Sequence, residues 1–262
     1  MPAQRPARPP VDATAPVPGW RLEVLPTSPS TNEHVRLRAL HGEPPGLVVV
    51  AEHQTSGRGR LDRSWVTPPR AALTFSLMVA PEGVPLARWS WLPLLSGLAV
   101  VEGVRRAAGL ATTLKWPNDV LVGDDKVAGI LVERVERPAG AIAVVGVGIN
   151  VSSTREELPV PTATSLELAG ATSVDRTALL VGTLGAFSRL YDGWLGAAGR
   201  GLRPSYVAAC STLGRRVRVE LPTGGSLTGQ AVGIDDSGRL EVDDGSGVRV
   251  LGAGDVVHVS PV

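Results

Sequence analysis

The sequence predicts an α/β (α+β) fold in one large domain, followed by a small all-β domain. In the first part of the chain, β-branched apolar runs alternate with segments whose apolar residues recur at helical spacing. After Cys210, short alternating runs are separated by Gly and Asp turns, which is typical of a small barrel or sandwich. At 262 residues and 43% hydrophobic content the chain can bury a core, and we expect domains at residues 20–211 and 212–262.

The first segment, residues 1–19, is predicted to be a disordered Pro-rich lead-in. Eight of the 29 residues before Ser30 are Pro, which lacks a backbone donor and fixes φ. Order is therefore expected to begin near Trp20. The segment contains no apolar run, so it does not have the pattern of a cleaved secretory signal.

The elements of the large domain follow from apolar spacing and capping residues. Ser, Thr and Asn stand at the start of residues 30–40, where they can cap the first turn of a helix. Residues 47–51 and 72–79 are apolar runs that predict buried strands, and Asp175 is the expected cap of a long helix with an apolar stripe. The other predicted elements are a helix at 87–108 and strands at 112–114, 120–122, 127–135 and 141–147.

Residues 52–70 show neither helical nor strand period and are predicted to form a long loop, which in compact domains usually carries function. The glycines of this loop would let the backbone approach a ligand, and its arginines would supply paired donors for anionic oxygens. A solvated turn or a nonspecific nucleic-acid contact is the alternative for such a run alone. The residues concerned are Gly57, Arg58, Gly59, Arg60, Arg63 and Trp65.

Three further sets of residues can carry chemistry. Residues 115–119 (KWPND) combine a cation, an aromatic ring and polar side chains, although a simple turn between strands is the alternative. Lys126 stands at the head of an apolar strand, where a lysine can also merely guard the edge. Gly146 and Gly148 leave one strand face bare for a flat ligand, or they mark a bulge or a tight packing contact.

Charge and cysteine content limit the class of protein. The 26 Lys+Arg against 25 Asp+Glu give a net charge of +1, so no global field favours nucleic acid or anionic lipid as a partner. Cys210 is the single cysteine and cannot form an intrachain disulfide. The most apolar stretch, residues 89–104, is interrupted by Pro93 and Glu102 and is too short to span a bilayer. We therefore expect a cytoplasmic protein without a membrane or nucleic-acid partner.

The order of these motifs along the chain resembles that of the biotin protein ligase family. The resemblance implies a class II aminoacyl-tRNA synthetase-like core, the biotin-lipoate ligase fold, with a mixed sheet flanked by helices over residues 20–211. It also implies a small SH3-like C-terminal β-barrel at 212–262. The matching sets are Ser30-Thr31-Asn32, Gly57-Arg58-Gly59-Arg60, Lys115-Trp116-Pro117-Asn118-Asp119, residues 126–133 and residues 146–150.

The resemblance further implies an ATP-dependent reaction in two steps. Biotin and ATP first give biotinyl-5′-AMP and pyrophosphate, and an acceptor lysine of a biotin carboxyl carrier domain then takes the biotin. Because the carboxylate and the α-phosphate repel each other, cations must hold them together. The expected partner is the carrier domain of an acyl-CoA or pyruvate carboxylase, and the expected assembly is a monomer or a weak homodimer.

Roles for individual residues are carried over by the same resemblance. Lys126 and Arg60 are the expected catalytic residues, Asp119 is the expected ligand of a Mg²⁺ ion, and Trp65 is expected to pack on adenine. The expected biotin-binding residues are Ser30, Thr31, Asn32, Gln54, Arg58, Gly59, Arg60, Lys126, Gly146 and Gly148. The expected ATP- and adenylate-binding residues are Gly57, Arg58, Arg60, Arg63, Trp65, Lys115, Asn118, Lys126 and Asn150.

One position departs from the family pattern. Where many relatives carry a second Gly after the arginine pair, this chain has Leu61 and Asp62. If that position needs a positive φ, Asp tolerates it better than most residues but at some cost. The departure concerns the dynamics of the loop and the retention of the adenylate, whereas the expected reaction type does not depend on it.

The sequence disfavours three other functions. A DNA-binding repressor would need a winged helix-turn-helix, for which the Pro-rich residues before Ser30 leave no room. A lipoate ligase or octanoyltransferase would share the core fold, but the GRGR and KWPND motifs are those of the biotin branch. An RNA-binding module is disfavoured because the chain has no basic stripe with interleaved aromatic residues.

Overall fold

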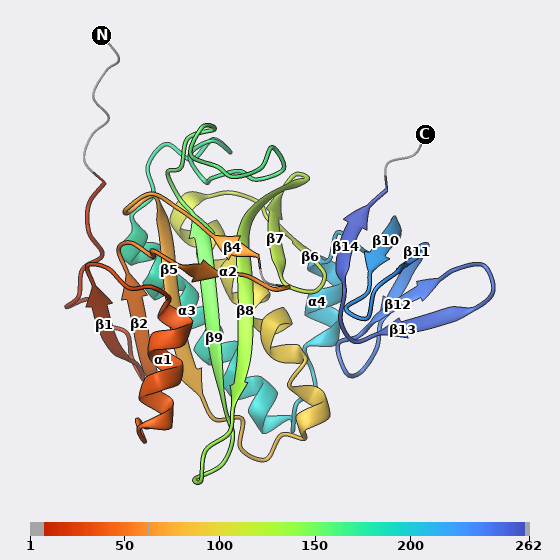
Figure 1. Cartoon of the computed structure of the whole chain (residues 1–262), viewed down its shortest axis with the longest axis horizontal. Helices are drawn as coiled ribbons and strands as arrows, with labels where there is room; N and C mark the ends of the chain where they lie inside the picture. The colour runs from red at the N-terminus through yellow and green to blue at the C-terminus, as the bar shows by residue number, and fades with distance from the viewer. Residues whose placement is uncertain (1–7, 62, 260–262) are drawn as a thin grey trace.

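A mixed seven-stranded sheet forms the centre of the large domain in the computed structural model, which describes residues 8–61 and 63–259 (Figure 1). The first two strands are parallel to each other, and every other neighbouring pair is antiparallel. In spatial order the strands are β1 (Arg21–Leu25), β2 (Leu47–Ala51), β5 (Ala72–Val79), β9 (Ile142–Asn150), β8 (Asp125–Val135), β7 (Asp119–Val122) and β6 (Thr113–Lys115).

Helices cover both faces of this sheet, because successive side chains of a strand point to opposite faces. One face packs against α1 (Thr31–Leu40) in a cluster that includes Val49 and Met78. The other face packs against α2 (Trp91–Ala108), which in turn contacts α3 (Arg176–Gly196). A short 3₁₀ helix, Leu86–Arg88, precedes α2.

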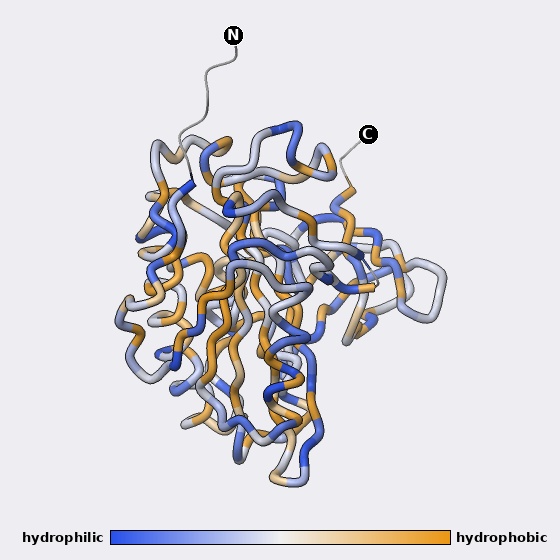
Figure 2. The backbone as a smooth tube through the Cα atoms, turned by 60° about the vertical axis from the view of Figure 1, so that its left-hand side comes forward, coloured by the Kyte–Doolittle hydropathy of each residue, from blue (hydrophilic) through white to orange (hydrophobic). Residues whose placement is uncertain are grey.

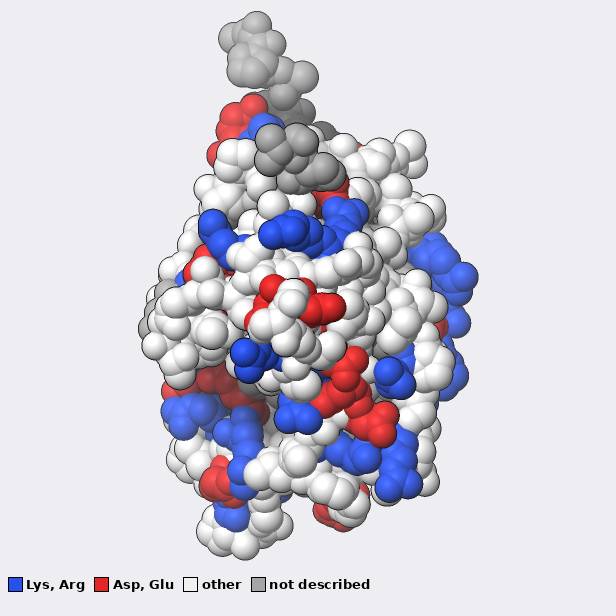
Figure 3. All heavy atoms as spheres, turned by 90° about the vertical axis from the view of Figure 1, so that its right-hand side faces the viewer, with Lys and Arg blue, Asp and Glu red and all other residues white. Residues whose placement is uncertain are grey.

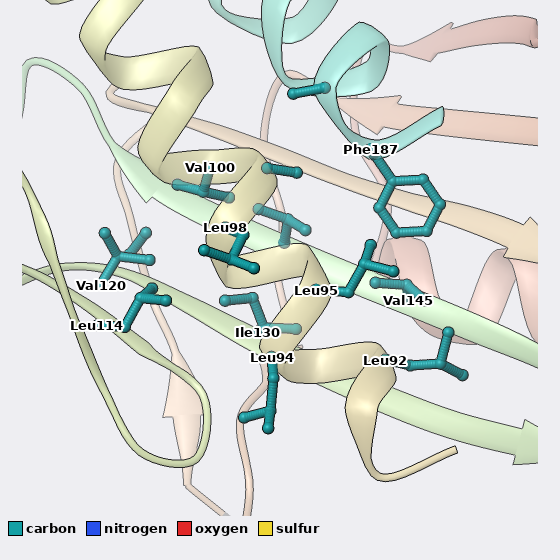
Figure 4. Packing of buried hydrophobic residues seen from close by; sticks show 14 of the residues in the cluster. Leu92, Leu94, Leu95, Leu98, Val100, Leu114, Val120, Ile130, Val145 and Phe187 are labelled. Carbon is teal, nitrogen blue, oxygen red and sulfur yellow. The ribbon is translucent and has the colours of Figure 1, made fainter. Parts of the chain in front are cut away.

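Leucines of α2 form the centre of the larger core. Figure 4 shows Leu95 near Val145 of the sheet and Phe187 of α3, and Leu94 and Leu98 belong to the same core cluster. Burying each of these side chains contributes about 1.5–3 kcal/mol to stability. Figure 2 shows hydrophobic residues concentrated along the central strands, as expected for a sheet that is covered on both faces.

The C-terminal domain is a five-stranded antiparallel sheet, joined to α3 through the short helix α4 (Arg203–Ala209). The alternating runs of the sequence explain it, since buried and exposed residues alternate along β10 and β11. In spatial order the strands are β13 (Val248–Leu251), β12 (Leu240–Asp243), β11 (Ser226–Ile234), β10 (Arg216–Glu220) and β14 (Asp255–His258).

Two buried indoles fix the C-terminal domain against the large one. Trp116 Nε1 donates to the carbonyl of Gly238 at 3.0 Å, and Trp91 Nε1 donates to that of Asp236 at 2.9 Å. Both carbonyls belong to the turn between β11 and β12. On the outer face of this side of the molecule, basic and acidic side chains are intermixed (Figure 3).

The prediction of a disordered lead-in is wrong for residues 8–19, while residues 1–7 lie outside the described part. Val11 is 4% exposed, and its backbone N–H donates to Glu52 Oε1 at 2.7 Å. The carbonyl of Pro9 accepts from Arg176 Nη2 at 2.6 Å. Proline lacks a donor but keeps its carbonyl, so a Pro-rich segment can be ordered when core side chains satisfy its remaining polar groups.

The remaining differences from the predicted elements are local. The helix expected at 87–108 is divided into the 3₁₀ helix and α2, and β9 continues beyond residue 147 to Asn150. The loop at 52–70 contains a two-residue strand pair, β3 (Gly57–Arg58) with β4 (Ser64–Trp65). Strand β1 and helix α4 were not predicted. Within the described residues, none of the helices is long and apolar enough to cross a membrane.

Candidate functional site

A cavity of about 800 Å³ opens where both domains meet the long loop. This size suits a small-molecule ligand. We call residues 55–61 and 63–65 the arginine loop. Besides this loop, the lining includes the start of α1, parts of β7, β8 and β9, residues 159–160 and 162–163, and residues 255–258 of β14. All the predicted site residues except Gly57 line this cavity, and Gly57 lines a second cavity to which the same loop also contributes.

Arg60 joins two of the motifs. Its Nη1 donates to Asn118 Oδ1 at 3.0 Å, and Asn118 Nδ2 donates in turn to the carbonyl of Ile130 on β8 at 2.9 Å. The same Arg60 nitrogen donates to the carbonyl of Gly254 in the C-terminal domain at 3.1 Å. Burial lowers the pKa of the Arg60 guanidinium, against the opposing influence of Asp255 and Asp119. The guanidinium is thus held in a partly desolvated place, where its charge acts strongly.

Lys126 and Lys115 converge on Asp119. The Nζ of Lys126 lies 2.6 Å from Asp119 Oδ1, and the Nζ of Lys115 lies 3.9 Å from Asp119 Oδ2. The strands β6, β7 and β8 bring the three side chains together, because Asp119 is paired with Lys115 across one ladder and with Gly129 across the other. Both lysines of the chain therefore lie in the cavity.

The start of α1 carries a buried polar network. Ser30 caps the helix by accepting from the backbone N–H of Glu33, and Gln54 Oε1 accepts from the backbone N–H and the hydroxyl of Thr31 at 2.8 and 3.1 Å. The Ser76 hydroxyl, which sequence reasoning missed, lies 2.7 Å from Thr31 Oγ1 and 2.6 Å from Asn32 Oδ1. A buried set of donors and acceptors fixed in this way can recognise a polar ring strictly.

Side chains of this chain pack against the two glycines of β9, which corresponds to the tight packing contact that the sequence left as the alternative to a bare face. Asn32 lies against Gly146, where a Cβ would overlap its side-chain oxygen. The Trp65 indole lies against Gly148, where a Cβ would be 2.5 Å from Cε2, and it also touches Gly129. The indole Nε1 is buried and has no hydrogen-bond partner among the described residues. The glycines thus admit this chain's own side chains into the space that a flat ligand was expected to occupy.

Two other predicted residues lie at the margins of this arrangement. Arg58 is half exposed and lies 3.3 Å from Glu33 and 3.4 Å from Glu133, whereas Arg60 is bound to Asn118. Asn150 is buried, and its amide donates to the carbonyl of Thr164 at 3.0 Å. The structure therefore separates the two arginines that the motif places two residues apart.

The predicted strain at Asp62 concerns a residue outside the described part of the chain. Its neighbour Leu61 has φ +52°, in the left-handed region that is costly for a branched side chain. The positive φ expected next to the arginine pair is therefore found at Leu61.

The lining residues of the C-terminal domain could not have been found from a local pattern. Asp255 and His258 belong to β14, whose sequence shows only an alternating strand. Residues 159–160 and 162–163 also belong to no recognisable sequence motif. In the structure residues 162–163 lie beside β8, where Lys126 and Ala163 form an isolated bridge. These groups reach the cavity through tertiary packing, which no sequence motif records.

His258 provides a pH-dependent prediction. Burial, with the charges of Arg215 and Lys115, lowers the pKa of His258 to about 4. Because this is below the ordinary value near 6.5, the neutral ring contributes stability that is complete above about pH 6.5 and is lost as pH falls toward 4. An NMR titration of the His258 ring should give this low pKa. The variant His258→Gln should unfold with a weaker pH dependence in that window, and a ring pKa above 6 would contradict the prediction.

Comparisons with known proteins identify the family of both parts of the chain. Residues 24–150 match the Biotin/lipoate A/B protein ligase family, and residues 212–259 match the Biotin protein ligase C terminal domain. The chain is 43% identical to a biotin--[acetyl-CoA-carboxylase] ligase of Mycobacterium tuberculosis, over 92% of this chain and 90% of the relative. It is 35% identical to the protein of that name from Paracoccus denitrificans, over 81% of this chain and 92% of the relative.

A solved structure shares the whole architecture. The biotin protein ligase from Aquifex aeolicus in complex with biotin and ATP superposes with a TM-score of 0.77 at 28% identity, covering 90% of this chain and 97% of that one. The mixed sheet and the antiparallel C-terminal sheet are therefore the fold of these enzymes. Since both parts of the chain match, and a relative is 43% identical over nearly its whole length, the chain belongs to the biotin protein ligase family.

Proposed function

We propose that the protein is an ATP-dependent biotin protein ligase that forms biotinyl-5′-AMP and then transfers biotin to a lysine of a carrier domain. The observation that carries the proposal is the convergence of Arg60, Asn118, Asp119 and Lys126 in one cavity. The family gives the reaction, and this convergence supplies the cations that the reaction needs.

In the first step, a carboxylate oxygen of biotin attacks the α-phosphorus of ATP. An O–P bond forms, the bond to the β-phosphate breaks, and pyrophosphate leaves. Lys126 and Arg60 offset the repulsion between the two anions, because both cations line the cavity and the Arg60 guanidinium is partly desolvated there. Asp119 orients Lys126 through their 2.6 Å ion pair. The network of Thr31, Gln54 and Ser76 is suited to the ureido ring of biotin.

Magnesium would assist through Asp119. Among the described residues, no group of three or more His, Cys, Asp or Glu could hold a metal ion, and Asp119 already faces two ammonium groups. The single Asp119 carboxylate would therefore supply one ligand, and the phosphates of ATP would supply most of the others. This is a common way for proteins to bind Mg²⁺. When bound, the ion would supply further neutralisation of the phosphate charge.

In the second step, the ε-amine of the acceptor lysine attacks the carbonyl carbon of the mixed anhydride. A C–N bond forms, the C–O bond to phosphate breaks, AMP leaves, and the amine loses a proton. The acceptor is the carrier domain of an acyl-CoA or pyruvate carboxylase, and the reaction takes place in the cytoplasm. The single cysteine, Cys210, is buried and free, in keeping with a reducing compartment.

The proposal is tested by biotin-dependent exchange of labelled pyrophosphate into ATP, which needs no carrier. We expect exchange with biotin and none with lipoate or octanoate. Exchange with lipoate alone would assign the protein to the lipoate branch of the family, and exchange with neither would refute the adenylation step. A purified biotin carboxyl carrier domain then tests the transfer, since its mass should rise by one biotinyl group.

A glycine on the sheet gives a further prediction. The change Gly148→Ala is expected to weaken adenylate formation at least tenfold, because the added methyl group would lie 2.5 Å from the Trp65 indole. Binding of biotin and ATP, measured by calorimetry, should weaken in parallel. The matched control is Gly185→Ala in α3, where nothing lies within 4 Å of the new methyl group. Equal activity in both variants would contradict close packing of Trp65 on Gly148.

A further inference from the structure

The arginine loop is attached to the C-terminal domain at two points. Arg63 Nη2 donates to Asp255 Oδ2, and Arg60 Nη1 donates to the carbonyl of Gly254 at 3.1 Å. Gly254 and Asp255 are consecutive residues at the start of β14. One short segment of the second domain thus contacts both arginines on either side of Leu61.

Leu61 makes such an attachment necessary. Its φ of +52° lies in the left-handed region, which a leucine adopts only when its surroundings determine the conformation. Leu61 is itself half exposed, so its own side chain contributes little packing. The contacts of Arg60 and Arg63 hold the backbone on both sides of it.

The residues that receive these contacts are rigidly placed. A Cβ at Gly254 would lie 2.5 Å from Val219 Cγ1 and 3.2 Å from the carbonyl of Glu220, so the backbone passes close to β10. Asp255 is paired with Glu220 in the ladder of β10 and β14. Since Trp116 and Trp91 fix the whole domain against the large one, the segment acts as a fixed anchor for the loop.

We propose that Asp255 is a positioning residue for adenylation: it holds Arg63, and with the Gly254 carbonyl it keeps the arginine loop and Arg60 in their working place. The proposal rests on the proposed ligase function for its kinetic consequence, but the attachment itself does not. Asp255 touches no reacting atom in this scheme. It acts through Arg63 of the other domain, while the adjacent Gly254 carbonyl holds Arg60.

The size of the effect follows from the exposure of the pair. Arg63 is 62% exposed and Asp255 is 22% exposed, so their ion pair is of the solvent-screened kind. Removing the carboxylate charge should therefore lower the equilibrium constant for attachment of the loop about twofold to fivefold. The effect should be smaller at high salt, which screens the pair.

The test compares Asp255→Asn with Glu220→Gln. The control removes a carboxylate at the paired position of the neighbouring strand, where Glu220 is bound to Arg218 and not to the loop. In pyrophosphate exchange, Asp255→Asn should raise the KM for ATP about twofold to fivefold at low salt with little change in kcat. The conservative variant Asp255→Glu should restore most of the loss.

A second readout is independent of activity. Arg58, Arg60 and Arg63 are trypsin sites, so cleavage after these residues reports how firmly the loop is attached. Cleavage there, followed by mass spectrometry, should be about twofold to fivefold faster in Asp255→Asn than in the wild type, and unchanged in Glu220→Gln. If both variants match the wild type in cleavage and in KM, the proposal is overturned. Absence of exchange in every variant would instead refute the ligase function and leave the cleavage result to decide the attachment.

Discussion

Replacing Lys126 by alanine is expected to lower biotin-dependent pyrophosphate exchange by about 10²–10³-fold, the usual cost of removing one group that stabilises developing charge. The ammonium of Lys126 lies 2.6 Å from Asp119 and projects into the cavity beside Trp65. Without it, the carboxylate of biotin and the α-phosphate would approach with Arg60 as the main remaining cation. The loss should appear in kcat as well as in kcat/KM, because the charge develops in the transition state.

The chain offers a matched control for this variant. Lys115 is the only other lysine, and its ammonium lies 3.9 Å from the same aspartate. The change Lys115→Ala should have a smaller effect on exchange, with most of it in the KM for ATP. Thermal unfolding of both variants shows whether the fold persists. If the two variants lose activity equally while remaining folded, Lys126 would not have the special role assigned to it.

The motifs could be predicted from sequence because they are short and local. Residues 115–119 and Lys126 are near each other in the chain, and a hairpin of β7 and β8 suffices to bring Asp119 next to Lys126. The buried strands could likewise be predicted from runs such as residues 47–51, since a strand buried on both faces has no polar positions.

Contacts between distant segments could not be predicted in this way. Nothing in the sequence near Gly254 indicates that its carbonyl accepts from Arg60, which is 194 residues earlier in the chain. The position of Trp65 on Gly148 is of the same kind, because the sequence left open whether a ligand or a packed side chain lies beside this glycine. A glycine within a strand indicates that another group packs closely against the backbone, but only the tertiary structure identifies that group.

The order of the N-terminal segment also depends on contacts between distant residues. Composition predicts disorder when a segment cannot bury enough apolar surface, and residues 8–19 contain few large apolar side chains. The segment is nevertheless held by Glu52 and Arg176, which are themselves buried at 7% and 4% exposure. These two residues stand at positions 52 and 176, so the sequence gives no local sign that they meet.

This buried ion pair carries the last prediction. The change Arg176→Ala is expected to lower the free energy of unfolding by about 3 kcal/mol, because it leaves the Glu52 carboxylate buried with only the more distant Arg70, at 3.5 Å, as a cationic partner. The lost guanidinium also donates to the carbonyls of Ala72 and Pro9, which then lose a hydrogen bond each. Urea unfolding measures the change.

The double variant Arg176→Met with Glu52→Gln separates charge from packing. This variant leaves neither member of the buried pair charged. Its free energy of unfolding should therefore be closer to that of the wild type than is that of Arg176→Ala, since the cost of a broken buried pair lies mainly in the uncompensated partner. Limited proteolysis should cut residues 8–19 faster in Arg176→Ala than in the wild type, because both Pro9 and Val11 depend on this pair. A loss below 1 kcal/mol together with unchanged proteolysis would mean that the buried apolar side chains of the segment, and not the ion pair, hold it in place.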